Sequence, residues 1–241
     1  MIIQWLKAAV KQHLPEIVPL VHALRSKVEA SGSRSQAGLL PDLFTRVYDS
    51  NYWGNAQSRS GNGSDLSQTA QIRAQIPELI RDFGIESMLD IPCGDFFWMN
   101  ECKLGIETYI GADIVPGIIA DLNGRYGTAL RRFIVLDLTK DPLPKVDLVL
   151  CRDMLVHFSS AHIRSALANL KRSGSTYLLT TTFIARSENL DIATGGDWRP
   201  LNLQIAPFAF PKPLRLISEG CTEYYNEFTD KSLGLWRLAD L

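Results

Sequence analysis

The sequence lacks the patterns that mark several large classes of protein. No apolar run reaches the roughly 18 residues that a membrane-spanning helix needs. Residues 1–6 lack the basic region of a secretory signal peptide, and no small-residue cleavage site follows them. The cysteines form neither a CxxC pair nor a Cys/His metal pattern, since they are widely spaced at Cys93, Cys102, Cys151 and Cys221. These absences predict a cytoplasmic protein with reduced thiols and no transmembrane segment, and they give no indication of a metal centre.

The sequence also has almost no net charge. Its 25 Lys and Arg residues stand against 26 Asp and Glu residues, which gives a formal charge of −1. Without a global positive field, neither nucleic acid nor an anionic membrane is an expected partner. The apolar share of 46% is ordinary for a globular protein, and 241 residues suit one domain with a full core.

The N-terminal part, residues 1–47, is predicted to be a helical extension. Apolar residues recur at helical spacing from Ile3 to Leu14, Pro15 interrupts the pattern, and a second stretch begins at Ile17. A helix lying on a membrane surface is one interpretation, but basic residues are few. The pattern therefore favours helices that dock on a partner or on a second copy of the chain. Residues 31–40 are rich in Ser and Gly and predict a linker.

From residue 87 onward the pattern predicts alternating strands and helices, after a helix expected over about 66–83. Short apolar runs predict strands at 87–91, 108–112, 132–137, 146–151 and 175–182, separated by segments long enough for crossover helices. This alternation is typical of an α/β fold, a mostly parallel sheet with helices on both faces. The last two strands, 214–221 and 233–238, are too close for a crossover helix, so an antiparallel hairpin is expected.

Acidic residues end three successive predicted strands. Asp90 precedes the loop Pro92-Cys93-Gly94-Asp95, in which Gly94 would admit a ligand against the backbone. Asp113 follows about 20 residues later, where a carboxylate is placed to accept hydrogen bonds from ribose hydroxyls. Asp137 ends the third strand, where it would accept a bond from an adenine amino group. Each acid alone could be a helix cap or a turn residue, but three in succession favour a nucleoside site.

With these motifs, residues 87–241 resemble the class I S-adenosylmethionine-dependent methyltransferases. The first motif of that family is similar to Leu89–Asp95, and its fourth strand to Val146–Cys151. The resemblance implies a Rossmann-like seven-stranded sheet with an antiparallel last strand, in a methyltransferase domain spanning 48–241. It also implies S-adenosyl-L-methionine as cofactor, with contacts from Asp90, Pro92, Gly94, Asp113, Ile114, Asp137, Leu138, Cys151 and Arg152.

The glycine loop departs from the family pattern. Pro92 and Phe96 replace the first and third of the three alternating glycines. A nicotinamide-dependent oxidoreductase needs those glycines to admit a pyrophosphate, whereas S-adenosylmethionine has no phosphate. Two alternatives to a methyltransferase stay open: such an oxidoreductase, and an inactive methyltransferase-like module that binds partners through residues 1–47.

His157, just beyond the fourth strand, is the candidate catalytic base. A hydroxyl acceptor must lose a proton during methyl transfer, and the ordinary pKa of histidine suits that task. Asp153 would orient His157 if the two lay four residues apart on a helix; it could instead cap a helix or contact the substrate. The alternative for His157 is an inert, hydrogen-bonded residue in the following helix.

Two segments outside the minimal core are candidates for substrate binding. Residues 48–64 join aromatic side chains to a Gly/Ser loop suited to closing over a ligand, and Arg59 and Ser64 would meet the cofactor's carboxylate. Residues 184–213 mix an aromatic platform with hydrogen-bonding groups, which suits a polar small molecule or a saccharide methylated at oxygen. Packing on the core is the alternative for both segments. The predicted substrate residues are Tyr52, Trp53, Thr182, Asn189, Trp198, Arg199 and Asn202.

Overall fold

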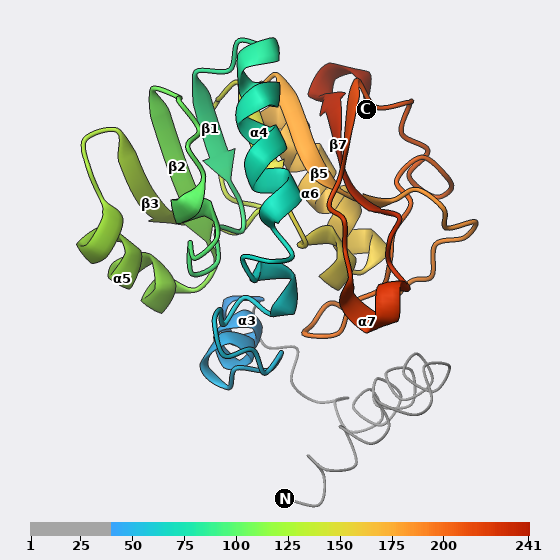
Figure 1. Ribbon diagram of the computed structural model, residues 1–241, viewed down its shortest axis with the longest axis horizontal. Coiled ribbons are helices and arrows are strands. Elements are labelled where there is room, and N and C mark those ends of the chain that lie inside the picture. Colours follow the sequence, from blue (N-terminus) through green and yellow to red (C-terminus); the bar gives the residue numbers. More distant parts are fainter. Residues whose placement is uncertain (1–39) are drawn as a thin grey trace, which may run out of the picture.

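The computed structural model describes residues 40–241 (Figure 1). The helices expected over residues 1–30, and the contact with a second chain assigned to them, lie outside the described residues. Among residues 40–241, no helix combines the length and the apolar character needed to cross a membrane.

A seven-stranded sheet forms the centre of the structure, in the order β3-β2-β1-β4-β5-β7-β6. Strand β7 runs antiparallel to both β5 and β6, while the other pairs are parallel. The expected mostly parallel sheet and its closing antiparallel hairpin are therefore confirmed. The strands are β1 (Ser87–Asp90), β2 (Thr108–Asp113), β3 (Arg131–Val135), β4 (Leu148–Cys151), β5 (Tyr177–Phe183), β6 (Arg215–Ser218) and β7 (Lys231–Arg237).

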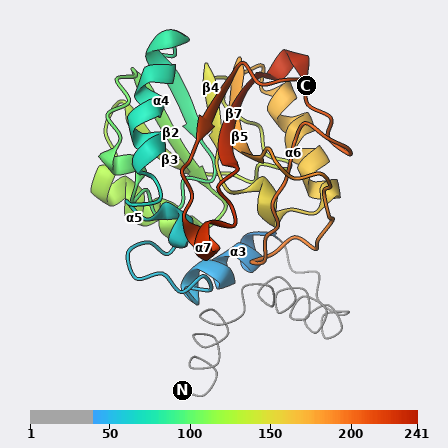
Figure 2. The same ribbon diagram turned by 45° about the vertical axis from the view of Figure 1, so that its right-hand side comes forward.

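Helices cover both faces of the sheet, as Figure 2 shows. Neighbouring side chains of a strand point to opposite faces, so Met88 belongs to one apolar cluster and Leu89 to the other. The cluster around Met88 takes in the buried faces of α4 (Ala70–Asp82) and α5 (Pro116–Tyr126). The cluster around Leu89 takes in α6 (Ser160–Arg172). Two helices thus pack on one face and one on the other.

The predicted helix over 66–83 is observed as α4, with its apolar stripe buried. Ile72, Ile76 and Leu79 are fully buried against the sheet. The helix begins at Ala70 because residues 65–69 form a turn, in which the Thr69 hydroxyl donates to the Asp65 carbonyl at 2.8 Å. Helix α3 (Leu40–Asp49) and the short α7 (Glu223–Asn226) lie at the lower edge in Figure 1, toward which β1 points.

The expectation of a helix in every crossover is wrong for two of them. Between β1 and β2 the described chain forms only the short 3-10 helix η2 (Met99–Glu101). Phe96 there has a positive φ of 60°, which a continuing right-handed helix does not allow, and its ring packs on Tyr109 and Phe133. Between β3 and β4 a turn around Asp137 replaces the helix, and Pro142 and Pro144 follow it.

Candidate active site

A cavity lies where the carboxyl ends of β1, β2 and β4 meet α3 and the segment 53–64. Its empty volume is about 1000 Å³, part of which opens to solvent. Carboxylates, aromatic rings and one imidazole share its wall, contributed by residues 90–95, 113–115 and 152–157 among others. Parallel α/β sheets place ligands at this edge because the loops after the strands converge there.

Asp90 ends β1 and faces this cavity from a buried position. Only 3% of the residue is exposed, and the Tyr109 hydroxyl donates a hydrogen bond of 2.5 Å to its Oδ2. No described residue donates to Oδ1. Burial raises the pKa of Asp90 to about 7, against the lowering effects of Tyr109 and Arg152. A carboxylate in this state is stabilised by a ligand that brings a positive charge or a donor.

Asp113 ends β2 beside Asp90 and fastens the loop between β1 and η2. Its Oδ2 accepts from the Gly94 amide at 3.2 Å, and its Oδ1 accepts from the Val115 amide at 3.0 Å. Burial raises the pKa of Asp113 to about 6, although these amide bonds oppose the rise. Each oxygen keeps a second lone pair, so the carboxylate can still accept hydrogen bonds from a ligand in the cavity.

Gly94 is needed for a close approach inside the protein. A Cβ on Gly94 would lie 2.2 Å from the Ser60 Oγ, and the residue has a positive φ of 51°. Asp95 pins the same loop, since its carboxylate accepts from the Ser58 hydroxyl at 2.9 Å and from the Arg59 amide at 2.9 Å. The segment 58–64 is thereby held against the β1 loop and closes one side of the cavity.

His157 ends the 3-10 helix η3 (Leu155–His157) and lines the same cavity as the two acids. Its Nδ1 lies 2.9 Å from the main-chain oxygen of Asp197, an atom that only accepts, so Nδ1 carries the hydrogen. The other nitrogen, Nε2, has no partner among the described residues. Burial lowers the pKa of His157, and the imidazole is therefore neutral at neutral pH, with a lone pair at Nε2.

Asp153 lines the same cavity but is not on a helix with His157. It follows β4 with a positive φ of 53°, and a bend separates it from η3. Its carboxylate accepts from Lys231 Nζ at 2.7 Å and from the Thr181 hydroxyl at 3.1 Å. Burial alone would raise the pKa of Asp153, but Arg152 and Lys231 hold it below its ordinary value. The helical spacing expected to link Asp153 to His157 is therefore wrong.

A buried ionic network backs this part of the cavity. Arg152 binds Glu219 through two hydrogen bonds, Nη2–Oε2 at 2.6 Å and Nε–Oε1 at 3.3 Å. Lys231 Nζ lies 3.4 Å from Glu219 Oε2 and also pairs with Asp153. Arg152 Nη2 donates to the Gly63 carbonyl at 2.8 Å. The network thus joins β4, β6, β7 and the loop that closes the cavity.

The fold is similar to those of solved methyltransferases. Human N-acetylserotonin methyltransferase with S-adenosylmethionine matches with a TM-score of 0.57 and 15% identity, over 87% of this chain and 61% of that one. N-methyltransferase NodS from Bradyrhizobium japonicum WM9, with S-adenosylhomocysteine, matches with a TM-score of 0.57 and 12% identity, over 79% and 97%. The methyltransferase domain of bacterial CtHen1-CN gives 0.53 and 11%, over 72% and 100%.

The chain has the class I methyltransferase fold. It spans about three fifths of the length of the human protein, 61%. The amino-acid sequence itself matches no protein-family model and no curated protein.

The methyltransferase fold brings most of the predicted cofactor residues to one cavity. The residues that line it are Asp90, Pro92, Gly94, Asp113, Ile114, Arg152 and Ser64. Four other predicted cofactor residues, Arg59, Asp137, Leu138 and Cys151, are not part of that lining.

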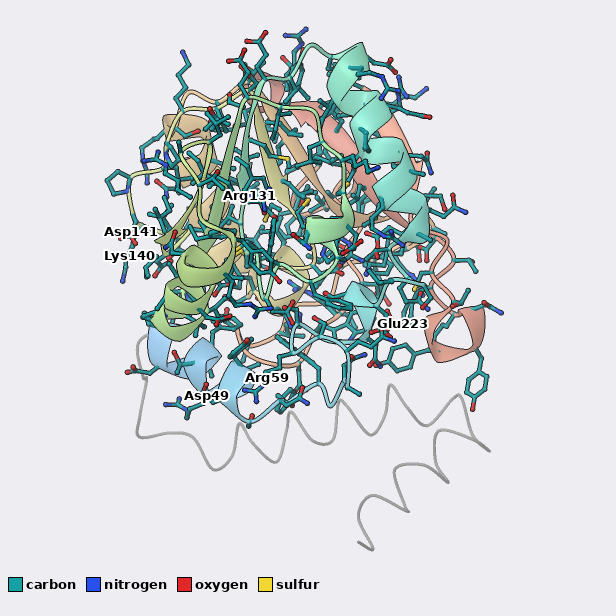
Figure 3. The ribbon with its side chains drawn as sticks, turned by 60° about the vertical axis from the view of Figure 1, so that its left-hand side comes forward. Asp49, Arg59, Arg131, Lys140, Asp141 and Glu223 are labelled. Carbon is teal, nitrogen blue, oxygen red and sulfur yellow. The ribbon has the colours of Figure 1, made fainter. Side chains whose placement is uncertain are left out.

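The positions of two of these four have clear physical reasons. Asp137 accepts from the amide and the hydroxyl of Thr139, at 2.9 and 2.6 Å, and so acts as a turn residue, while Leu136 lines the cavity. Arg59 is exposed next to α3 (Figure 3), where its guanidinium lies 5.5 Å from the centre of the Tyr48 ring. Neither the Asp137 nor the Arg59 side chain bonds Asp90 or Asp113, the acids at the ends of β1 and β2.

The predicted substrate residues divide into two groups. Trp53 lines the cavity, with its ring centre 5.3 Å from that of His157, and Tyr52 beside it donates to Asp197 Oδ1 at 3.0 Å. The others hold the segment 184–213 together and do not line this cavity: Thr182, Asn189, Trp198, Arg199 and Asn202 bond main-chain groups or pack on Phe183 and Phe228.

Several residues that line the cavity were not predicted from the sequence. Phe44 and Tyr48 come from α3, Ser60 from the closing loop, and Trp98 from the first crossover. Their signal was present only as aromatic and small polar residues near predicted site segments. Lys231 and Glu219 had none, since nothing in the pattern separates a buried ion pair from surface charge. Within residues 40–241, no cluster of three or more His, Cys, Asp or Glu side chains is arranged for a metal ion.

Proposed function

We propose that the protein transfers a methyl group from S-adenosylmethionine to oxygen of a polar small molecule or saccharide. The observation that carries this proposal is one cavity whose lining includes Asp90, Asp113 and a neutral histidine, His157. The methyltransferase fold supports it, since the acids stand at the strand ends where that fold is open to a ligand.

The donor groups of the cavity fit the cofactor. Asp113 would accept hydrogen bonds from the two ribose hydroxyls, because each carboxylate oxygen retains a lone pair beside the bond from an amide. Asp90 would face the ammonium group, since a buried carboxylate with a raised pKa and an unpartnered oxygen gains most from a cation. Arg152 and Ser64, which also line the cavity, would donate to the cofactor's carboxylate. The cofactor supplies a methyl group already activated on a sulfonium.

The protein's own part in the reaction is positioning and proton removal. His157 holds its hydrogen on Nδ1, so Nε2 can take the proton of an acceptor hydroxyl. The Trp53 ring packs on the imidazole and, with Phe44 and Tyr48, provides an apolar wall for the acceptor. Holding acceptor and methyl group in line is worth several kcal/mol of the barrier.

Calorimetry with two cofactors tests the choice of donor. We expect the purified chain to bind S-adenosylhomocysteine and to give no heat with NAD, because Pro92 and Phe96 stand where a pyrophosphate would need glycines. Binding of NAD without binding of S-adenosylhomocysteine would overturn the proposal. Binding of S-adenosylhomocysteine with no methyl transfer to any hydroxyl acceptor would instead favour a module that has the fold without the activity.

His157→Ala tests the base. We expect turnover to fall by about 100-fold or more, because a positioned general base contributes about 10²–10⁴-fold. Affinity for S-adenosylhomocysteine should remain as in the wild type, since the two acids are unchanged. His162→Ala is the matched control, because His162 lies on α6 and bonds Thr194 outside the cavity lining. Equal turnover in wild type and His157→Ala would remove His157 from this role.

A further inference from the structure

The segment Gly195–Arg199 wraps around η3, the short helix that ends in His157. The Gly195 amide donates to the His157 carbonyl at 3.1 Å, and the Arg199 amide donates to the Val156 carbonyl at 3.2 Å. Between them, the Asp197 carbonyl accepts from His157 Nδ1 at 2.9 Å. Both the backbone and the ring of His157 are thus fixed by one five-residue segment.

Arg199 fastens this segment to η3. Its Nη1 donates to the carbonyls of Leu155 and Val156 at 3.0 and 2.7 Å, and its Nε donates to the Leu190 carbonyl at 3.0 Å. Carbonyls at the end of a short helix lack partners within it, so a side chain that supplies donors stabilises that end. Arg199 is 6% exposed and does not line the cavity, which sets it apart from a substrate contact.

Two aromatic residues that precede the loop 58–64 also bond this segment. Trp53 Nε1 donates to the Gly196 carbonyl at 2.9 Å, and the Tyr52 hydroxyl donates to Asp197 Oδ1 at 3.0 Å. A Cβ on Gly196 would lie 2.8 Å from the Tyr52 ring, so the two segments are in close contact. The segment that positions His157 is therefore held by Tyr52 and Trp53 as well as by Arg199.

We propose that Arg199 is a positioning residue that, through the segment Gly195–Arg199, holds His157 with its hydrogen on Nδ1 and its Nε2 lone pair toward the cavity. This inference rests on the proposed function, in which Nε2 takes the acceptor's proton. A free imidazole in water favours the opposite tautomer, with the hydrogen on Nε2. A carbonyl fixed at Nδ1 reverses that preference, since it can only accept.

Charged groups around His157 act in opposite directions on its pKa. Burial lowers it, the hydrogen bond to the Asp197 main-chain oxygen and the carboxylates of Asp153 and Asp197 raise it, and the charge of Arg199 lowers it. Burial lowers the pKa of Arg199 itself to about 10, so the guanidinium stays charged at neutral pH. Loss of Arg199 would act on the pKa of His157 in both directions: it removes a positive charge and admits water, which raise the pKa, and it weakens the bond to the Asp197 carbonyl, which lowers it. The tautomer distinguishes positioning from charge, because a nearby charge alone does not decide which ring nitrogen carries the hydrogen.

The test is nitrogen-15 NMR of the histidine rings in the full chain, with His157 assigned from the His157→Gln variant. In the wild type we expect the Nδ1–H tautomer at neutral pH and a midpoint below the ordinary histidine value. Arg199→Met should shift the ring toward the Nε2–H tautomer. Arg199→Lys keeps the charge and a donor, so it should restore part of the wild-type tautomer. Arg164→Met, which removes an exposed arginine of α6, is the matched control and should change neither the tautomer nor the midpoint.

Each outcome decides the proposal. A folded Arg199→Met protein with the wild-type tautomer would overturn it. If Arg199→Met does not fold, Trp53→Phe removes the bond to Gly196 and should shift the ring in the same direction; an unchanged ring would then be the contrary result. Binding of S-adenosylhomocysteine to the wild type is measured separately. The absence of binding would count against the proposed function. The tautomer measurement would still decide separately whether Arg199 positions the ring.

Discussion

Replacing Asp113 with asparagine will weaken the binding of S-adenosylhomocysteine by about 100-fold or more. The carboxylate would accept two ribose hydroxyls, and hydrogen bonds to a charged group contribute about 1.5–3 kcal/mol each. Asparagine keeps one acceptor oxygen but is neutral, so one bond is lost and the other falls to the strength of a neutral bond, which together cost about 3 kcal/mol. Each 1.4 kcal/mol is about tenfold in affinity. An asparagine also turns an NH₂ group toward the Gly94 or the Val115 amide, where the carboxylate accepts. Titration calorimetry at pH 8 measures the difference.

The matched control for this variant is Asp137→Asn. Asp137 also follows a strand, but its carboxylate turns back on Thr139 and does not line the cavity. We expect Asp137→Asn to bind S-adenosylhomocysteine as the wild type does. Comparable losses in the two variants would contradict the assignment of the ribose to Asp113.

The pH dependence of binding gives an independent check on the two acids. Burial raises the pKa of Asp113 to about 6 and that of Asp90 to about 7 in the ligand-free protein. Both are expected to bind in the ionised form, so affinity should rise as the pH rises through this range and level off above it. Asp113→Asn should show a weaker rise, since only Asp90 remains. A flat profile in the wild type would mean that neither acid contacts the ligand.

The sheet could be predicted from sequence because its strands are short, apolar and bounded by polar turns. Burial on both faces gives β4 a continuous apolar run and gives β5 a run of apolar and β-branched residues, and the short connection before β7 excludes a parallel crossover. Asp90 and Asp113 could be placed in one site for a related reason: parallel strands end at one edge of the sheet. The sheet topology therefore predicts this part of the site without knowledge of any side-chain contact.

The same reasoning could not separate Asp113 from Asp137. Both are acids after a strand, but the Thr139 amide and hydroxyl compete for Asp137, and only the backbone turn reveals that competition. Residues 184–213 were misleading for a similar reason. Their hydrogen-bonding side chains satisfy main-chain groups within an irregular segment, as Asn202 does with the Arg186 carbonyl at 2.9 Å. A polar, aromatic composition is the same for a loop that binds a ligand and a loop that binds itself.

Glu219→Gln should lower the free energy of unfolding by about 3–5 kcal/mol, the usual cost of removing one partner of a buried ion pair. Glu219 is 2% exposed, and its loss leaves the buried positive charges of Arg152 and Lys231 paired with the partly exposed carboxylate of Asp153. For a domain of this size each kcal/mol moves the Tm by about 2–4 °C, so a fall on the order of 10 °C is expected. Thermal unfolding followed by circular dichroism measures it.

The exposed pair Arg215–Asp82 provides the control for the Glu219 variant. Its N–O distance is 2.8 Å, close to the 2.6 Å of Arg152–Glu219, but its side chains are 42% and 51% exposed. Water solvates each partner when the other is removed, so Asp82→Asn should cost about 1 kcal/mol or less. Similar losses in the two variants would show that burial does not strengthen the dependence of Arg152 on its partner. The loss of Glu219 is also expected to affect the candidate active site, because Arg152 donates to the Gly63 carbonyl and so holds the loop that closes the cavity.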